Sequence, residues 1–70
     1  MDIIIYTQDM CGYCDAAKKE FDRRGWDYTA YNVDDEDNKQ ALLKLLPNCL
    51  VPQIWIDNKH IGGYYDLMTW

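Results

Sequence analysis

Residues 3–14 read IIIYTQDMCGYC, and this stretch decides the fold. It starts with four apolar residues in a row, 3–6, which is typical of a central strand buried on both faces of a sheet. A short polar stretch follows, and then Cys11 and Cys14 stand at the start of a segment with helical periodicity. The pattern predicts a helix over residues 12–24, ended by a glycine. The cysteine pair is therefore expected where a buried strand passes into a helix.

The rest of the chain alternates between strand and helix signals. We predict a strand over residues 28–33 and then a helix capped by the acidic residues 34–37, whose apolar stripe is Ala41, Leu42, Leu45 and Leu46. A strand over residues 53–57 follows, and a two-residue turn at Asn58 and Lys59 joins it to a strand from His60. A short helix is expected after Gly62 and Gly63. The order β-α-β-α-β-β-α indicates an α/β fold in which the first two strands are parallel.

The composition limits the class of protein. The chain has 70 residues, 49% of them apolar, and a net charge of −5. This predicts one domain over residues 1–70 with a thin core. Its seven Lys and Arg residues are scattered, which disfavours a nucleic-acid partner. No apolar run approaches the roughly 20 residues of a membrane span, and no signal-peptide pattern is present, so we expect a cytoplasmic location and no membrane partner.

Cys11 and Cys14 have different predicted roles. The free N–H groups and the positive dipole end at a helix N-terminus favour the thiolate of Cys11. Cys14, one turn later, faces the apolar side with Ala17 and Phe21 and is expected to be shielded. The spacing therefore predicts that Cys11 attacks a disulfide substrate and that Cys14 then displaces the product by bonding to Cys11.

A zinc half-site is the alternative interpretation of the cysteine pair. Zinc requires further ligands, and only the isolated Cys49 and His60 are available. We therefore expect redox chemistry and no bound metal. Cys49 is interpreted as a half-buried apolar residue, with an oxidisable thiol near the site as the alternative. His60 is interpreted as a hairpin residue.

Three segments together resemble the glutaredoxin family. They are the Cys11 to Cys14 motif after a strand, the segment VPQIWID at residues 51–57, and the segment HIGGYYD at residues 60–66. The resemblance covers nearly the whole chain. It implies a thioredoxin-like fold, with a central four-stranded mixed sheet flanked by helices. It also implies a glutathione-disulfide oxidoreductase with glutathione as co-substrate. The length of the chain is similar to that of virus-encoded members of the family.

The resemblance also implies the glutathione-binding residues. Pro52 is expected to be cis and Val51 to pair with the glutathione backbone, although an ordinary turn proline would also fit. Gly63 and the backbone N–H groups of Tyr64 and Tyr65 would meet the γ-glutamyl carboxylate. Two further assignments have simpler alternatives. Tyr13 would flank the glutathione sulfur or be an exposed aromatic, and Asp66 would bind the glutamyl ammonium or be a first-turn helix acid.

The sequence departs from the family pattern at three positions. Gln8 stands where many relatives have Lys, and Leu50 stands where Thr is usual. Gly12 replaces the commoner Pro between the cysteines, and relatives with a small residue there sometimes hold a [2Fe–2S] cluster between two subunits. A glutathione-assisted cluster carrier is therefore the alternative function. The favoured function reduces protein disulfides and glutathione mixed disulfides as a monomer, with ribonucleotide reductase as a client that the family suggests.

Overall fold

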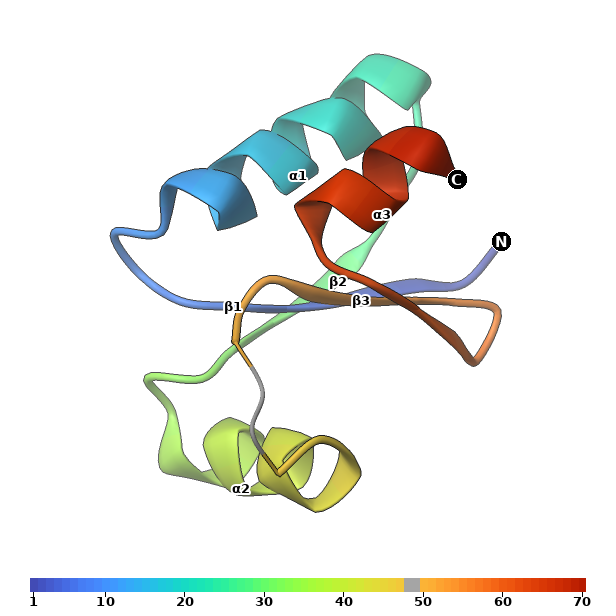
Figure 1. The fold of residues 1–70 in the computed structure, drawn as a ribbon. Coiled ribbons are helices and arrows are strands. Elements are labelled where there is room, and N and C mark those ends of the chain that lie inside the picture. The colour runs from blue at the N-terminus through green and yellow to red at the C-terminus, as the bar shows by residue number, and fades with distance from the viewer. Residues whose placement is uncertain (48–49) are drawn as a thin grey trace.

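A computed structural model describes residues 1–47 and 50–70. Within these ranges the elements follow the predicted order (Figure 1). They are β1 (Ile3–Thr7), α1 (Gly12–Arg24), β2 (Thr29–Asn32), α2 (Glu36–Leu45), β3 (Gln53–Ile56), β4 (Lys59–Gly62) and α3 (Tyr64–Thr69). No helix in the described ranges has the length and apolar character needed to cross a bilayer.

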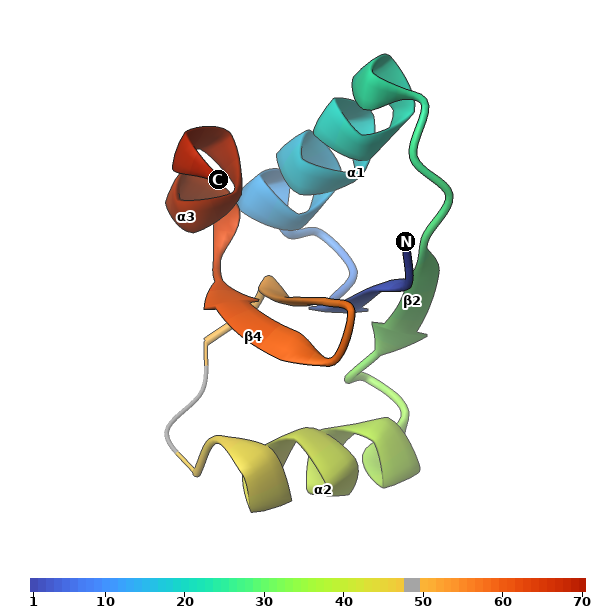
Figure 2. The same cartoon turned by 90° about the vertical axis from the view of Figure 1, so that its right-hand side faces the viewer.

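The four strands form one mixed sheet in the order β2-β1-β3-β4 (Figure 2). β1 pairs with β2 in parallel, and α1 is the crossover between them. β1 also pairs with β3, and β3 with β4, in antiparallel fashion. Ile5 in the middle of β1 lies between Ala30 and Ile54. The predicted central strand and mixed sheet are therefore confirmed.

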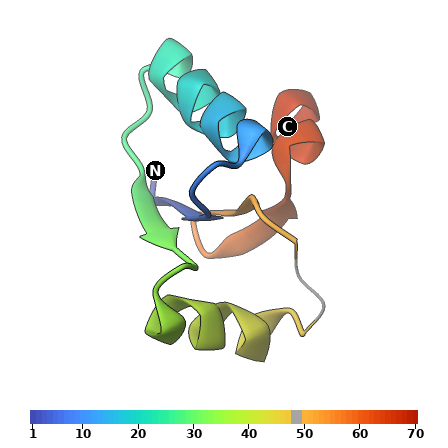
Figure 3. The same ribbon diagram turned by 90° about the vertical axis from the view of Figure 1, so that its left-hand side faces the viewer.

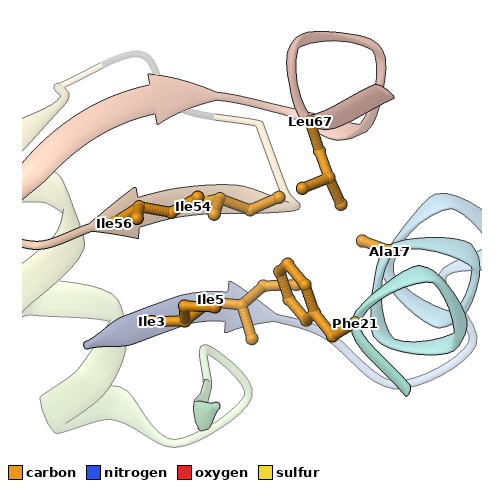
Figure 4. Close-up of a cluster of buried hydrophobic side chains, with 7 residues drawn as sticks. All are labelled: Ile3, Ile5, Ala17, Phe21, Ile54, Ile56 and Leu67. Carbon is orange, nitrogen blue, oxygen red and sulfur yellow. The ribbon is translucent and has the colours of Figure 1, made fainter. Parts of the chain in front are cut away.

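The two faces of the sheet are covered by different helices. α1 and α3 lie on one face and α2 lies on the other (Figures 1 and 3). Between the sheet and the α1/α3 layer is a core of Ile3, Ile5, Ala17, Phe21, Ile54, Ile56 and Leu67, each at most 3% exposed (Figure 4). Full burial of one such large side chain contributes about 1.5–3 kcal/mol, so this layer is the main source of stability.

The face of the sheet toward α2 is covered less completely. Ile4 and Tyr6 of β1 are only half-buried, so the prediction of a strand buried on both faces is wrong for this face. Tyr6 contacts Tyr31 at 5.4 Å and Trp55 at 5.6 Å between ring centroids. The Trp55 ring in turn lies 4.6 Å from that of His60. An aromatic row thus crosses all four strands on this side.

The ends of α1 follow the sequence signals. Cys11 is the N-cap, and Gly25 ends the helix in the left-handed conformation with φ of 71°. Cys14, Ala17 and Phe21 all lie on the buried face, as predicted. The local pattern sufficed here because one strong apolar stripe faces one well-packed layer.

The buried face of α2 differs from the predicted stripe. Asp35 caps the helix as expected, and its side chain accepts hydrogen bonds from the N–H groups of Asp37 and Asn38. Leu42 is fully buried, but Ala41 and Leu45 are exposed. Leu42 is therefore the residue that α2 buries fully, and Leu46 of the predicted stripe is half-buried.

The hairpin turn lies one residue earlier than predicted. Asp57 and Asn58 form it, with φ of 51° and 68°, and Lys59 already pairs with Ile56. Two-residue turns that match the strand twist need positive φ at both positions, which Asp and Asn tolerate better than Lys.

Candidate active site

The cysteine pair forms a disulfide at the start of α1. The Cα atoms of Cys11 and Cys14 are 5.2 Å apart. The backbone N–H of Cys14 donates to Cys11 Sγ over 3.2 Å, so the sulfur of the N-cap residue receives a helix N-terminal donor. Cys14 is fully buried and Cys11 is half-buried. The predicted asymmetry between the two sulfurs is confirmed in kind, with Cys11 the more accessible.

The loop before β3 faces the disulfide. The peptide bond between Val51 and Pro52 is cis, as the resemblance implied. The carbonyl oxygen of Val51 lies 4.0 Å from Cys11 Sγ. Pro52 is buried and Val51 is half-buried.

The start of α3 is held against the same loop. Gly62 has φ of 116°, and a Cβ there would collide with the carboxylate of Asp66. A Cβ on Gly63 would lie 3.3 Å from the carbonyl oxygen of Pro52, so the chain passes close to the loop. The N–H of Gly63 donates to Asp66 Oδ2 over 2.9 Å. Asp66 therefore has the helix-capping role that was one of its two predicted roles.

Three tyrosines cover one side of the site. The ring of Tyr13 lies 5.8 Å from that of Tyr64 and 5.6 Å from that of Tyr65. The hydroxyl groups of Tyr13 and Tyr65 are 3.0 Å apart and form a hydrogen bond between α1 and α3. This bond, together with nearby charge and partial burial, raises the pKa of Tyr65. Sequence reasoning missed the pair, because Tyr13 and Tyr65 are 52 positions apart.

An open cleft of about 640 Å³ leads to Cys11 between the sheet end and α2. Its lining includes Val51 and the exposed apolar side chains of Met10 and Leu50. Gln8 also lines it and donates to Asp34 Oδ1 over 3.4 Å. Lys39 of α2 is the cation in this lining.

Lys39 was not among the predicted site residues. Lys39 is three residues before Leu42, and residues with this spacing lie on the same side of a helix. This spacing was the sequence signal that could have predicted Lys39 at the cleft, because both residues line it.

Two other candidates lie apart from this arrangement. His60 is exposed and bonds Gln53 Oε1 over 2.7 Å, which fits the predicted hairpin role. Cys49 lies outside the described residues. Across residues 1–47 and 50–70, no three His, Cys, Asp or Glu side chains gather as a metal site would require.

Comparisons with known proteins agree with this geometry. A family model described as Glutaredoxin matches residues 3–61. The glutaredoxin of Pseudomonas aeruginosa is 38% identical over 66 residues, which cover 93% of this chain and 79% of the relative.

Two solved structures share the fold. The buckwheat glutaredoxin–glutathione complex matches with a TM-score of 0.82 and 34% identity, over 96% of this chain and 64% of that chain. The Escherichia coli NrdH-redoxin, a glutaredoxin-like protein with a thioredoxin-like activity profile, matches with a TM-score of 0.78 and 28% identity. The latter match covers 97% of this chain and 90% of that chain. The thioredoxin-like fold is thereby confirmed.

The family match spans most of the chain and includes the cysteine motif at the strand-to-helix junction. Cys11 and Cys14 are accordingly the redox-active disulfide of a thiol–disulfide oxidoreductase. The chain belongs to the glutaredoxin family.

Proposed function

We propose that this chain is a glutathione-dependent oxidoreductase that reduces protein disulfides and glutathione mixed disulfides. The observation that carries the proposal is the meeting of three distant segments. The disulfide, the backbone of Val51 and the start of α3 surround one accessible sulfur, that of Cys11. A substrate bound there would present one sulfur of its disulfide to Cys11, while the peptide backbone of the substrate lies along the loop of Val51.

The reaction follows from the difference between the two cysteines. The Cys11 thiolate attacks the glutathione sulfur of a mixed disulfide, and the protein thiolate leaves. A second glutathione thiolate then attacks the same sulfur, which releases oxidised glutathione and restores Cys11. With a protein disulfide, Cys11 first forms a mixed disulfide with the client, and the Cys14 thiolate then attacks the Cys11 sulfur and releases the reduced client. Two glutathione thiols reduce the Cys11–Cys14 bond and leave as oxidised glutathione. Cys14 is therefore needed for protein disulfides and dispensable for glutathione mixed disulfides.

Each end of glutathione has a proposed contact. The N–H groups of Tyr64 and Tyr65 belong to the first turn of α3, where backbone donors lack partners within the helix, and they would bind the γ-glutamyl carboxylate. Asp66 Oδ2 already accepts from Gly63, so Oδ1 is assigned to the glutamyl ammonium. Lys39 is assigned to the glycine carboxylate at the other end of the cleft, and Tyr13 flanks the sulfur.

The remaining parts of the proposal concern context. The chain acts as one domain over residues 1–70, as a cytoplasmic monomer. Ribonucleotide reductase is the protein client to be tested first, since the family resemblance suggests it.

The test is reduction of a small glutathione mixed disulfide, coupled to NADPH through glutathione reductase. We expect Cys11→Ser to abolish activity and Cys14→Ser to retain a substantial part of it. Lys39→Gln should raise KM for glutathione with little change in kcat, since it removes binding and not chemistry. Lys44→Gln on the same helix is the matched control, because Lys44 does not line the cleft.

Two outcomes would contradict the proposal in different ways. Undiminished disulfide reduction when glutathione is replaced by a flavoenzyme and NADPH would indicate a thioredoxin-like electron route. If the wild-type protein has no oxidoreductase activity, and protein purified without oxygen absorbs visible light, the result would instead support the cluster carrier.

A further inference from the structure

Thr7 at the end of β1 has an unusual side chain. It is 3% exposed, and its Oγ1 has no hydrogen-bond partner among the described residues. The backbone of Thr7 is satisfied in part, since its carbonyl accepts from the N–H of Val33 over 2.8 Å. A buried hydroxyl without a partner is uncommon, and such a group calls for a physical explanation.

The spacing along β1 and α1 brings Thr7 toward the disulfide. Its side chain lies on the same face of β1 as Ile5, toward α1, because side chains alternate along a strand. Ile5 belongs to the same core cluster as Phe21 and Ala17 of α1 (Figure 4). Two residues on β1 advance about 6.6 Å, and one turn of α1 in the reverse direction advances about 5 Å. Since α1 runs back over this face of β1 (Figure 1), these spacings bring Thr7 toward the turn of α1 that holds Cys14.

The sheet register adds a second argument for this position. Tyr6 pairs with Gln53 across the antiparallel β1 and β3 strands. This pairing ends at Gln53, and the same register continued by one residue would bring Thr7 opposite the buried Pro52 of the cis peptide bond. Thr7 is thus the last residue of β1 before the loop that leads to Cys11.

We propose that Thr7 Oγ1 is the hydrogen-bond partner of the Cys14 sulfur in the reduced protein. Reduction by a dithiol breaks the bond between Cys11 and Cys14, and two electrons and two protons pass to the protein while the dithiol becomes a disulfide. The buried Cys14 sulfur then becomes a thiol or thiolate with no covalent partner. The Thr7 hydroxyl donates to the thiolate or accepts from the thiol. The hydroxyl has no partner in the disulfide form, so a bond gained on reduction favours the dithiol and makes the protein a stronger oxidant.

The test is the redox equilibrium of the whole chain with dithiothreitol. This reductant removes any dependence on glutathione binding, so a failed glutathione proposal and a failed Thr7 proposal are distinguishable. Thr7→Val keeps the shape and removes the hydroxyl. We expect its equilibrium constant for reduction to fall about tenfold, which equals a potential lower by about 30 mV. Thr7→Ser keeps a hydroxyl and should stay close to wild type.

A second measurement reports on the Cys14 sulfur directly. In a Cys11→Ser background with Cys49→Ser, Cys14 is the remaining thiol. We expect Thr7→Val to move the midpoint of its alkylation rate to higher pH, and Thr7→Ser to leave the midpoint in place. This readout also serves if Thr7→Val folds poorly with the disulfide intact.

Either of two results would overturn the proposal. One is an equilibrium constant and a pH midpoint that are unchanged in Thr7→Val. The other is an equal shift in Thr7→Val and Thr7→Ser, which would show that packing and not the hydroxyl is responsible.

Discussion

The two faces of the sheet are built differently. Toward α1 and α3, the side chains are aliphatic or Phe and almost fully buried, and Leu67 fixes α3 in the same layer. Toward α2, a half-exposed aromatic row is met by a helix with one fully buried residue, Leu42. The cysteines and the start of α3 belong to the well-packed side, while α2 supplies a wall of the cleft. The α1/α3 side of the sheet, which we call the firm face, thus positions the two sulfur atoms. The α2 side, which we call the looser face, gives a ligand access to them.

The largest expected loss of stability comes from a substitution in the core layer of the firm face. Phe21→Ala removes the largest fully buried side chain and should destabilise the protein by about 3–5 kcal/mol. A chain of 70 residues has a total stability of roughly 3–10 kcal/mol, so much of the protein would unfold at room temperature. Urea unfolding followed by circular dichroism measures the loss. Near-wild-type stability would mean that the α1/α3 layer is not the main core.

A paired substitution tests the looser face. Leu42→Ala should cost about 2 kcal/mol, at the lower end for a buried leucine, because α2 can settle toward the sheet. Leu45→Ala on the same helix is the control, since Leu45 is 57% exposed, and it should change the unfolding free energy by less than about 0.5 kcal/mol. Equal losses of unfolding free energy in the two variants, measured by urea unfolding, would instead support the predicted stripe, in which Leu42 and Leu45 share the buried face.

The same contrast explains which features could be predicted. The strand, the cysteine motif and the helix over residues 12–24 are local, and the apolar stripe of α1 meets a complete layer, so pattern and structure agree. The α2 stripe was misplaced because Leu42 alone is fully buried and the pattern of leucines does not say which faces the sheet. The turn at Asp57 and Asn58 was misplaced by one residue, since both neighbouring pairs contain acceptable turn residues.

The site itself divides along the same line. The cysteine pair and the cis Pro52 could be predicted from motifs, but the contacts between the segments depend on long-range register. The hydrogen bond between Tyr13 and Tyr65 and the position of Lys39 at the cleft required the structure. The unpaired hydroxyl of Thr7 likewise becomes visible only when burial and partners are known.

An ion-pair cluster on the firm side gives a pH-dependent prediction. Glu20 of α1 bonds Arg23 and Arg24, and Arg24 also donates to the backbone carbonyl of Leu67 in α3. The hydrogen bond from Arg23, followed by that from Arg24, lowers the pKa of Glu20 from 4.5 to about 2. Since the pKa is lower in the folded state, the pair stabilises the protein above pH 4.5 and this contribution is lost as the pH falls toward 2.

Glu20→Gln tests this cluster without a change of shape. Wild type should lose more stability than the variant between pH 4.5 and about 2, while the other carboxyl groups act equally in both proteins. Thermal unfolding at a series of pH values gives the two curves. Parallel curves over this range would contradict the role of Glu20 in joining α1 to α3.

The smallest effect concerns the tyrosine pair that also joins α1 to α3. The pKa of Tyr65 is raised above 10.0, first by its hydrogen bond to Tyr13. Tyr13→Phe should therefore bring the pKa of Tyr65 down toward 10.0, visible as an earlier phenolate midpoint in an ultraviolet pH titration. Tyr31→Phe on the looser face is the control, because it removes one tyrosine without touching the pair. The pair contributes stability below pH 10 that is lost as the pH rises through the raised pKa, so Tyr13→Phe should also flatten the alkaline decline in unfolding temperature. An unchanged midpoint and an unchanged decline would show that the two hydroxyl groups are not bonded in solution, and that this bond does not join α1 to α3.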